Sequence, residues 1–448
     1  MASRRPQIRS SPSSPSKIRK PITINHSFFK PVSEKKTTSL VQWQERKHQT
    51  GLRNTLLVGK YLHDNIVQNL EETVKLATFD LDGTLIKTAS GNLHSLDEYD
   101  WTWWDDSVPE KLRHFDSKGY RLIIFSNQNG IRLPGHPEFK RVAQYYQWKA
   151  KLDLILEDLN LPVTIYAATL TDNFRKPRIG MWESCLADIG RPVDKSGSYF
   201  VGDAAGRPQD HSCVDRKMAM NIGIKFFTPD EFFLGQTAQP YSLGEFCPSK
   251  HSPLNENPDF DRKNEKDIVL LVGMPGSGKS SFYRKVLKPL GYKRINQDTL
   301  KSRENCTKAA LFELEKGNSV AIDNTNVDQS TRAVWIKLAR TFNVPIRCIH
   351  LITSEPIARH NNLYRALSKV DQSVLSPSLL FKKAHFLEER RSNVPMVAYR
   401  HFRSRYQNPE LSEGFQDIVV LDFEFSGTEE ERKIWEMWWD DEPKSNFK

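Results

Sequence analysis

Two carboxylates separated by one residue follow a mostly apolar run early in the chain. Asp80 and Asp82 come directly after residues 74–79 and directly before Gly83 and Thr84. Side chains alternate along a strand, so both carboxylates project to the same side at its carboxyl end, where open α/β sheets bind ligands. Such a pair can hold Mg²⁺ through oxygen ligands. It also suits phosphoryl transfer in which one aspartate attacks phosphorus and the other moves the proton.

Three further polar groups follow in order, each near the end of an apolar run. Ser126 begins a polar turn that can hold phosphate oxygens, Lys176 can stabilise a transferring phosphoryl group, and Asp203 is a natural metal ligand. The acidic partner of Asp203 is either Asp210 or Asp215, and the sequence leaves both open.

The order of these groups resembles that of the haloacid dehalogenase superfamily of phosphatases. DLDGT, which begins at Asp80, matches its first motif, and Ser126, Lys176 and Asp203 match the next three. The resemblance implies a Rossmann-like α/β domain that forms an aspartyl-phosphate on Asp80 and uses Asp82 as acid and base. It also implies a Mg²⁺ site made by Asp80, Asp82 and Asp203.

A second chemical motif follows the apolar run 268–272. The segment GMPGSGKS fits the P-loop pattern directly after a buried strand. Backbone N–H groups of such a loop cradle nucleotide phosphates, the lysine reaches the β- and γ-phosphates, and the final hydroxyl binds Mg²⁺. The predicted ATP-binding residues are Gly273, Pro275, Gly276, Ser277, Gly278, Lys279 and Ser280.

The rest of this region predicts a small kinase, because it is too short for a motor ATPase with its accessory parts. Asp298 is the candidate base for an attacking hydroxyl; alternatively it caps a helix. Asp323 either completes the Mg²⁺ shell or orients a substrate-binding residue. Arg359 and Arg365 lie about two turns apart on a helical stretch, and such a helix presents arginines to the transferring phosphate. Arg365 is the stronger candidate.

The two motif sets together resemble the eukaryotic polynucleotide kinase 3′-phosphatases, in particular fungal-type members. The resemblance rests on FRKPRIGMW, FVGDAAGRP, GMPGSGKSSF, INQDTL, IDNTNVD and RHNNLYR, and on the phosphatase preceding the kinase. It implies DNA end healing, in which a 3′-phosphate is removed and a 5′-hydroxyl is phosphorylated. The implied cofactors and partners are Mg²⁺, ATP, DNA ends, and a repair scaffold or ligase.

Two departures from this family limit what the resemblance implies. A basic tail stands where vertebrate members have a forkhead-associated domain, so recruitment by phosphorylated scaffolds is not expected. Lys301 stands where the phage enzyme has an arginine.

Two other enzyme classes remain open. DxDGT followed by Asn-Gln also resembles histidinol-phosphate-type phosphatases, so a fused small-molecule phosphatase and kinase is one alternative. An RNA end-healing enzyme is the other. IDNTN and RHNN beside NQD favour a polynucleotide kinase.

The elements that must position these groups are two series of strands alternating with helices. Strands are predicted at 74–79, 121–125, 164–168 and 198–201, and then at 268–272, 319–322 and 346–352. The predicted fold is therefore α/β in two domains, a phosphatase followed by a P-loop kinase. We expect a basic Ser/Pro-rich tail at 1–42, the phosphatase at 43–236, a linker at 237–266 and the kinase at 267–448.

Charge and composition narrow the class of protein. The chain of 448 residues has a net charge of +10. Residues 1–60 contain 13 Lys and Arg against two acidic residues, so this charge belongs to the tail. That tail is either a solvated segment or a nuclear-import or nucleic-acid-tethering arm, and we expect a nuclear protein. The five cysteines are scattered, so neither a disulfide framework nor a zinc site is expected.

No apolar run approaches the ~20 residues of a membrane helix. Because both active sites are complete in one chain, we expect a monomer.

Residues that could contact nucleic acid are Trp101, Trp103, Trp104 and Trp182 by stacking, and Arg132, Arg175 and Arg178 through phosphates. Core packing is the favoured alternative for the tryptophans, and we expect the acidic, aromatic end of the chain (IWEMWWDD) to pack as a terminal helix.

Overall fold

The computed structural model describes residues 40–47, 53–62, 72–137, 142–244, 246–253, 256–368 and 393–441. Most of the predicted tail lies outside these ranges. Its last residues are described and belong to the folded part, since Val41 is buried and Gln42 begins the first strand. None of the helices described here is long and apolar enough to cross a bilayer.

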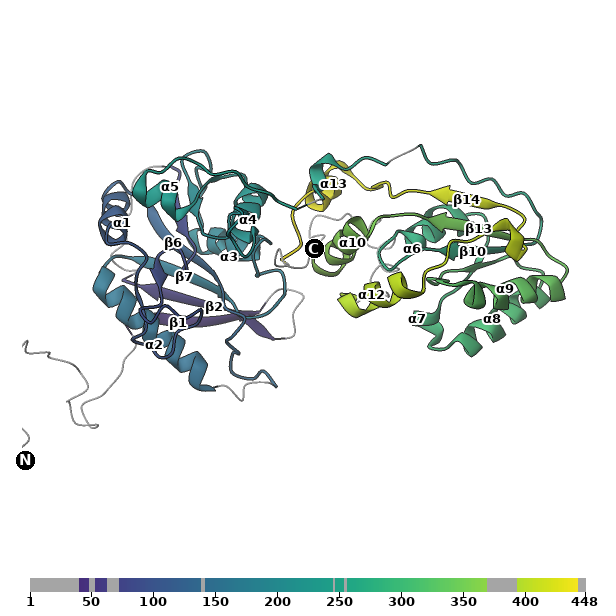
Figure 1. Ribbon diagram of the computed structural model, residues 1–448, viewed down its shortest axis with the longest axis horizontal. Coiled ribbons are helices and arrows are strands. Elements are labelled where there is room, and N and C mark those ends of the chain that lie inside the picture. Colours follow the sequence, from purple (N-terminus) through teal and green to yellow (C-terminus); the bar gives the residue numbers. More distant parts are fainter. Residues whose placement is uncertain are drawn as a thin grey trace, which may run out of the picture. The chain divides into compact units, whose positions relative to one another are not determined.

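The first domain is built on a seven-stranded sheet with the strand order β1-β2-β7-β6-β3-β8-β9 (Figure 1). β2 runs antiparallel to β1 and β7, and the other neighbours are parallel. The four predicted strands are confirmed to within two residues at each end, whereas the β1–β2 hairpin and β9 were not predicted. The strands are β1 (Gln42–Lys47), β2 (Asn54–Tyr61), β3 (Leu76–Phe79), β6 (Arg121–Asn127), β7 (Val163–Ala168), β8 (Tyr199–Val201) and β9 (Lys225–Phe227).

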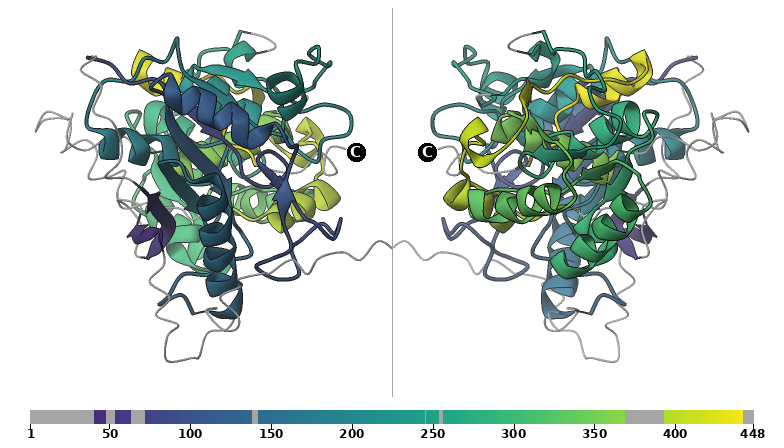
Figure 2. Two further views of the ribbon diagram at one scale, coloured as in Figure 1. Left: turned by 90° about the vertical axis from the view of Figure 1, so that its left-hand side faces the viewer. Right: turned by 90° about the vertical axis from the view of Figure 1, so that its right-hand side faces the viewer.

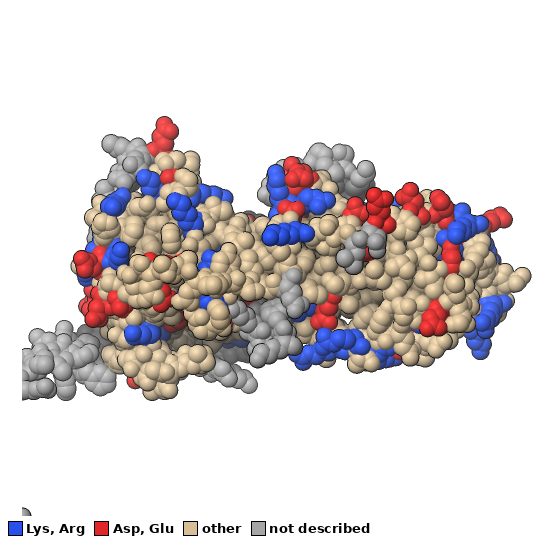
Figure 3. Space-filling view, turned by 45° about the horizontal axis from the view of Figure 1, so that its top comes forward, with Lys and Arg blue, Asp and Glu red and all other residues tan. Residues whose placement is uncertain are grey.

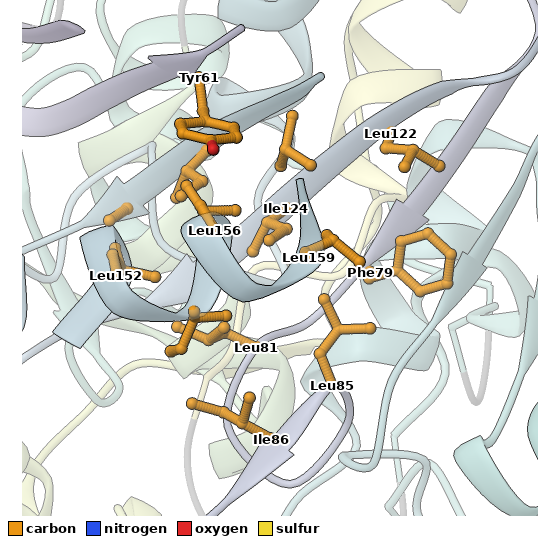
Figure 4. Close-up of a cluster of buried hydrophobic side chains, with 14 of the residues drawn as sticks. Tyr61, Phe79, Leu81, Leu85, Ile86, Leu122, Ile124, Leu152, Leu156 and Leu159 are labelled. Atoms are coloured by element: carbon orange, nitrogen blue, oxygen red, sulfur yellow. The ribbon is translucent and has the colours of Figure 1, made fainter. Parts of the chain in front are cut away.

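Helices cover both faces of this sheet, and each face has its own apolar cluster. On one face lie α1 (Val108–Ser117), α2 (Val142–Leu159) and α5 (Pro229–Leu234). On the other face lie α3 (Gly180–Ile189) and α4 (Val214–Ile222). Figure 4 shows Leu152, Leu156 and Leu159 of α2 among side chains of the sheet and of the turn after β3. A short hairpin of β4 (Ile86–Lys87) and β5 (Thr102–Trp103) follows that turn.

The second domain is built on a parallel five-stranded sheet with the strand order β11-β12-β10-β13-β14. The three strands predicted for it are confirmed as β10, β12 and β13, and β11 and β14 were not predicted. The strands are β10 (Ile268–Val272), β11 (Lys293–Ile295), β12 (Val320–Ile322), β13 (Ile346–Leu351) and β14 (Ile418–Leu421).

Helices also flank both faces of the second sheet (Figures 1 and 2). α8 (Arg303–Glu315) and α9 (Gln329–Thr341) supply the apolar cluster of one face, and the π-helical turn η6 (Tyr283–Leu287) contributes to the other. The remaining helices are α6 (Lys279–Phe282), α7 (Gln297–Leu300), α10 (Glu355–Leu367), α12 (Met396–Arg405) and α13 (Glu429–Trp435), with a 3-10 turn η8 (Leu411–Glu413).

In its described part, the predicted linker 237–266 contains one regular element, the 3-10 turn η5 (Pro248–Lys250). The boundaries 1–42, 43–236, 237–266 and 267–448 stay predictions. In both sheets the carboxyl ends of neighbouring parallel strands meet at one edge, where Asp80, Asp203 and the P-loop follow strands and Ser126 lies near the end of β6.

Candidate active sites

The first site lies at the carboxyl edge of β3, β6 and β8. Asp80 and Asp203 follow β3 and β8, and Ser126 is the penultimate residue of β6. The turn after β3 fits closely against β8. The Asp203 N–H donates to Thr84 Oγ1 at 3.0 Å, and a Cβ on Gly83, whose φ is +82°, would stand 2.6 Å from the Asp203 carboxylate. Glycine is therefore required at position 83.

Three carboxylates converge at this edge. Asp80, Asp203 and Asp215 each place an oxygen within 4.8 Å of the others, the arrangement of a metal-binding group. The structure thus favours Asp215 over Asp210 as the partner of Asp203. Asp210 instead forms an ion pair with Arg207 at 3.0 Å. Because Asp215 lies twelve residues after Asp203, on α4, the sequence could not distinguish the two.

Lys176 is the cation at the centre of this group. Its Nζ lies 2.5 Å from Asp80 and 2.8 Å from Asp215, and donates to the Phe125 carbonyl at 2.9 Å. Asn127 fixes the lysine's backbone, because its Oδ1 accepts from the Lys176 N–H at 2.9 Å. Burial disfavours the ammonium, but the two carboxylates outweigh burial and raise the pKa of Lys176. The lysine is therefore held charged beside Asp80.

The carboxylates carry more negative charge than one lysine offsets. Burial raises the pKa of Asp80 well above its usual value; Lys176 opposes this rise, and Asp215 and Asp203 add to it. Burial and Asp215 likewise raise the pKa of Asp203 to about 6. A divalent cation would relieve this repulsion, and carboxylate oxygens are the ligands that Mg²⁺ prefers. The residues present therefore fit a Mg²⁺ site.

Asp82, which the sequence also predicted as a Mg²⁺ ligand, lies outside the three-carboxylate group, where Asp215 stands instead. Asp82 is exposed, and its carboxylate accepts from Gln128 Nε2 at 2.7 Å and lies 3.6 Å from Lys151 Nζ. Gln128 Nε2 also donates to Ser126 Oγ at 2.8 Å, which connects Ser126 to Asp82. Sequence reasoning missed Lys151, because a single lysine on the amphipathic helix α2 gives no local signal.

The second site is the P-loop between β10 and α6. Lys279 is buried, and its Nζ donates to the carbonyls of Gly273 and Met274 at 2.8 and 2.7 Å. Gly276, with φ of +81°, lies against α10, where a Cβ would stand 2.1 Å from the Ala358 carbonyl oxygen. Asn361 Nδ2 of the same helix donates to the Gly276 carbonyl at 3.1 Å. α10 thus supports the loop that would hold the nucleotide phosphates.

The alternative reading of Asp298 as a helix cap is wrong. Asn296 caps α7, because its Oδ1 accepts from the Thr299 N–H at 3.2 Å. Asn296 also donates to the Asp323 carbonyl, which ties α7 to the end of β12. Asp298 lies exposed in the first turn of α7. That exposure suits a base that receives an incoming hydroxyl, and this role stays a prediction.

Asp323 contacts an arginine that sequence reasoning did not consider. Its carboxylate accepts from Arg294 Nε at 2.8 Å and Nη2 at 2.6 Å, and the same Nη2 donates to Ser280 Oγ at 3.1 Å. Asp323 and Ser280 therefore face one another across one guanidinium. This proximity fits a shared role around Mg²⁺, which stays a prediction for both.

The helical stretch predicted around residues 359–365 is α10. Arg365 Nη2 donates to Asn362 Oδ1 at 3.0 Å, and Arg359 lies 3.5 Å from Asp440. Asn361, between them, binds the P-loop, so this helix lies where an arginine could reach nucleotide phosphates. The catalytic role of Arg365 stays a prediction.

Several residues proposed for nucleic-acid contact have other roles. Trp182 is buried in the core of the first domain, so the stacking interpretation is wrong for it, and Trp101, Trp103 and Trp104 pack against the opposite cluster. Arg178 is 1% exposed and forms an ion pair with Asp441 at 2.7 Å, so it is not available for phosphates. On the face drawn in Figure 3, basic and acidic side chains are interspersed.

Comparison with known proteins identifies both halves of the chain. The family model described as polynucleotide kinase 3 phosphatase matches residues 75–233, and the model described as AAA domain matches residues 268–380. These matches cover β3, β6 and β8 at the first site and β10, which leads into the P-loop, at the second, and they confirm the predicted fold class.

Relatives match across both halves. The chain is 40% identical over 400 residues to the bifunctional polynucleotide phosphatase/kinase of Schizosaccharomyces pombe, covering 89% of this chain and 90% of that protein. It is 31% identical over 393 residues to a putative bifunctional polynucleotide phosphatase/kinase of Acanthamoeba polyphaga mimivirus, covering 80% and 86%. The polynucleotide 3′-phosphatase ZDP of Arabidopsis thaliana is 35% identical over 38% of this chain and 26% of its own length.

Proposed function

Because this chain belongs to the family of bifunctional polynucleotide phosphatase/kinases, it is an enzyme with both activities, and we propose that it heals DNA ends through the two sites described above. It would remove a 3′-phosphate and phosphorylate a 5′-hydroxyl, leaving the ends that a ligase joins. The observation that carries this proposal is the presence of both complete residue sets, at the edges of two separate sheets in one chain.

In the phosphatase reaction, the Asp80 carboxylate attacks phosphorus and forms an aspartyl-phosphate. Lys176, 2.5 Å away, holds Asp80 in place and offsets charge that develops on the phosphoryl oxygens. Asp82 gives a proton to the departing 3′ oxygen and then takes one from the water that hydrolyses the intermediate. Gln128 orients the Asp82 carboxylate for both transfers.

Mg²⁺ would be held by Asp80, Asp203 and the second acid Asp215, and when bound it supplies positive charge next to the phosphate. In the kinase reaction, the P-loop and Lys279 bind the ATP phosphates, while Asp298 accepts the proton of the 5′-hydroxyl as it attacks the γ-phosphate. Ser280 and Asp323 are proposed for the second Mg²⁺ site.

The experiment that tests this proposal compares three substrates with the full chain. They are a DNA and an RNA oligonucleotide of one sequence, each with a 3′-phosphate and a 5′-hydroxyl, and para-nitrophenyl phosphate. We expect kcat/KM for 3′-phosphate removal to be highest on DNA. A preference for RNA would replace DNA ends with RNA ends as the substrate, and activity confined to the small phosphomonoester would favour the fused small-molecule enzyme.

We also propose where in the cell the enzyme acts and which proteins receive its product. The basic tail, whose residues 1–39 lie outside the described structure, would direct the chain to the nucleus. There it would work as a monomer that passes its product to a ligase or repair scaffold. Loss of nuclear fluorescence from a tagged chain lacking residues 1–39 is the expected result. Unchanged nuclear accumulation of that deletion would refute an import role for the tail.

A further inference from the structure

The prediction that the acidic, aromatic end of the chain packs as a terminal helix is wrong beyond Trp435, because α13 is the last described helix and ends there. The described residues after it are nevertheless tightly bound. Trp435, which ends α13, is buried, and so are Trp438 and Trp439 beyond it. We call residues 438–441 the C-terminal clasp. Its two acidic residues, Asp440 and Asp441, have different partners, and the partners of Asp441 carry the inference.

Asp441 contacts both arginines that flank the phosphatase lysine. Its carboxylate lies 2.7 Å from Arg175 Nε and 2.7 Å from Arg178 Nη2. Arg178 also donates from Nε to the Trp439 carbonyl at 3.0 Å and from Nη1 to the Asp172 carbonyl at 3.0 Å. The Arg178 guanidinium therefore donates from all three nitrogens, and the residues on both sides of Lys176 are bound by Asp441.

Trp438 adds a second attachment to the same loop. Its N–H donates to Asn221 Oδ1 at 2.7 Å, and Asn221 Nδ2 donates to the carbonyls of Trp438 and Pro177, each at 2.9 Å. The ammonium of Lys217 lies 4.5 Å from the Trp438 ring centre, within cation–π range. One asparagine of α4 thus joins the clasp to Pro177, the residue directly after Lys176.

Trp435, which precedes the clasp, is hydrogen-bonded to the kinase helix α10. Trp435 Nε1 donates to Asn361 Oδ1 at 2.8 Å, and His360 Nε2 lies 2.6 Å from the Trp435 carbonyl. Asp440 lies 3.5 Å from Arg359. Because Asn361 also donates to the Gly276 carbonyl, a chain of hydrogen bonds joins the P-loop to Trp435.

We propose that the C-terminal clasp positions Lys176 for phosphate removal, with Asp441 acting through Arg175 and Arg178. Lys176 must keep its ammonium 2.5 Å from Asp80, and catalytic geometry tolerates little displacement. The clasp lies outside all four phosphatase motifs, so a phosphatase domain cut before the kinase would lack this support. This inference rests on the phosphatase activity proposed above.

The test is Asp441→Asn in the full chain, with Asp440→Asn as the matched control. Asp440 is the adjacent carboxylate and lies 3.5 Å from Arg359 of the kinase helix α10. We expect Asp441→Asn to lower the phosphatase kcat about tenfold on both a 3′-phosphate oligonucleotide and para-nitrophenyl phosphate, with KM unchanged. Asp440→Asn should keep the wild-type phosphatase kcat, and Asp441→Glu should recover most of the loss.

These readouts separate positioning from general damage. A variant that is merely unstable contains less active enzyme. The fraction of active enzyme, from an active-site titration under single-turnover conditions, and the melting temperature are therefore measured together with kcat. Should Asp441→Asn prove unstable, Arg175→Gln, which removes one of the two contacts, takes its place with the same expectation of reduced kcat. A wild-type kcat in these variants, or an equal loss in Asp440→Asn, overturns the proposal. Loss on the small phosphomonoester supports it even if DNA is not the substrate.

Discussion

Replacing Lys176 by methionine removes one charge and keeps the length of the side chain. The lysine is 2% exposed and contacts Asp80, Asp215 and the Phe125 carbonyl. Removing one preorganised donor from an active site costs about 3–4 kcal/mol in the transition state, which is about 10²–10³ in kcat. We therefore expect Lys176→Met to lose phosphatase kcat by that factor.

The same substitution changes stability in a pH-dependent way. Removing one partner of a buried ion pair costs about 3–5 kcal/mol. Lys176 is the cation that opposes the upward shift in the pKa of Asp80. Without it, Asp80 takes up a proton more readily, and a carboxyl with a raised folded-state pKa stabilises the fold as pH falls. The free energy of unfolding of Lys176→Met should therefore approach that of the wild type on going from pH 8 to pH 6.

The assay measures phosphatase kcat on a 3′-phosphate oligonucleotide and urea unfolding at both pH values. Phosphorylation of 5′-hydroxyl ends by the same protein is the internal control, because Lys279 and the P-loop belong to the second sheet. A loss of less than about tenfold, or about 1.4 kcal/mol, would refute the role given to Lys176. So would a stability difference that does not change with pH.

Three other perturbations test separate parts of the structure. Gln128→Ala removes the donor to Asp82 and Ser126, so kcat for phosphate removal should fall about tenfold in steady-state assays, and an unchanged kcat would contradict its orienting role. Arg332→Met removes a fully buried guanidinium that contacts Glu413 at 2.6 and 2.9 Å, so urea unfolding should show a loss of about 3–5 kcal/mol. A wild-type unfolding curve would show that this pair adds no net stability. Burial lowers the pKa of His360 from 6.5 to about 4, so the stability it contributes is full above pH 6.5 and is lost as pH falls towards 4. His360→Gln should reduce the slope of unfolding free energy against pH in that window by up to about 1.4 kcal/mol per pH unit, and an unchanged slope would contradict burial of the neutral form.

The sequence predicted the residues that follow strands of the two sheets. Asp80, Asp203 and the P-loop lie directly after short apolar runs, and parallel strands bring such positions to one edge whatever the rest of the chain does. The signal is local, and the fold class and both motif sets could therefore be identified without the structure.

Residues that reach a site from elsewhere could not be predicted in this way. Lys151 lies on α2, and the spacing of apolar residues in α2 shows which face packs on the sheet but not which polar side chain reaches the site. Arg294 lies in β11, a strand of only three residues. The β1–β2 hairpin was missed because β1 (QWQERK) contains a single apolar residue and lies within a basic region. Arg178 was assigned to phosphates because its partner Asp441 lies 263 residues away.

We propose that one chain heals both DNA ends at two separate sites. The most direct measurement uses a gapped duplex with a 3′-phosphate and a 5′-hydroxyl, and resolves both ends on one gel with Mg²⁺, with and without ATP. Wild-type protein should remove the 3′-phosphate without ATP and add a 5′-phosphate only with ATP. Asp80→Asn should abolish the first reaction alone, and Lys279→Met the second alone. Loss of both reactions in either folded variant, or no change at either DNA end with the wild type, would contradict the account.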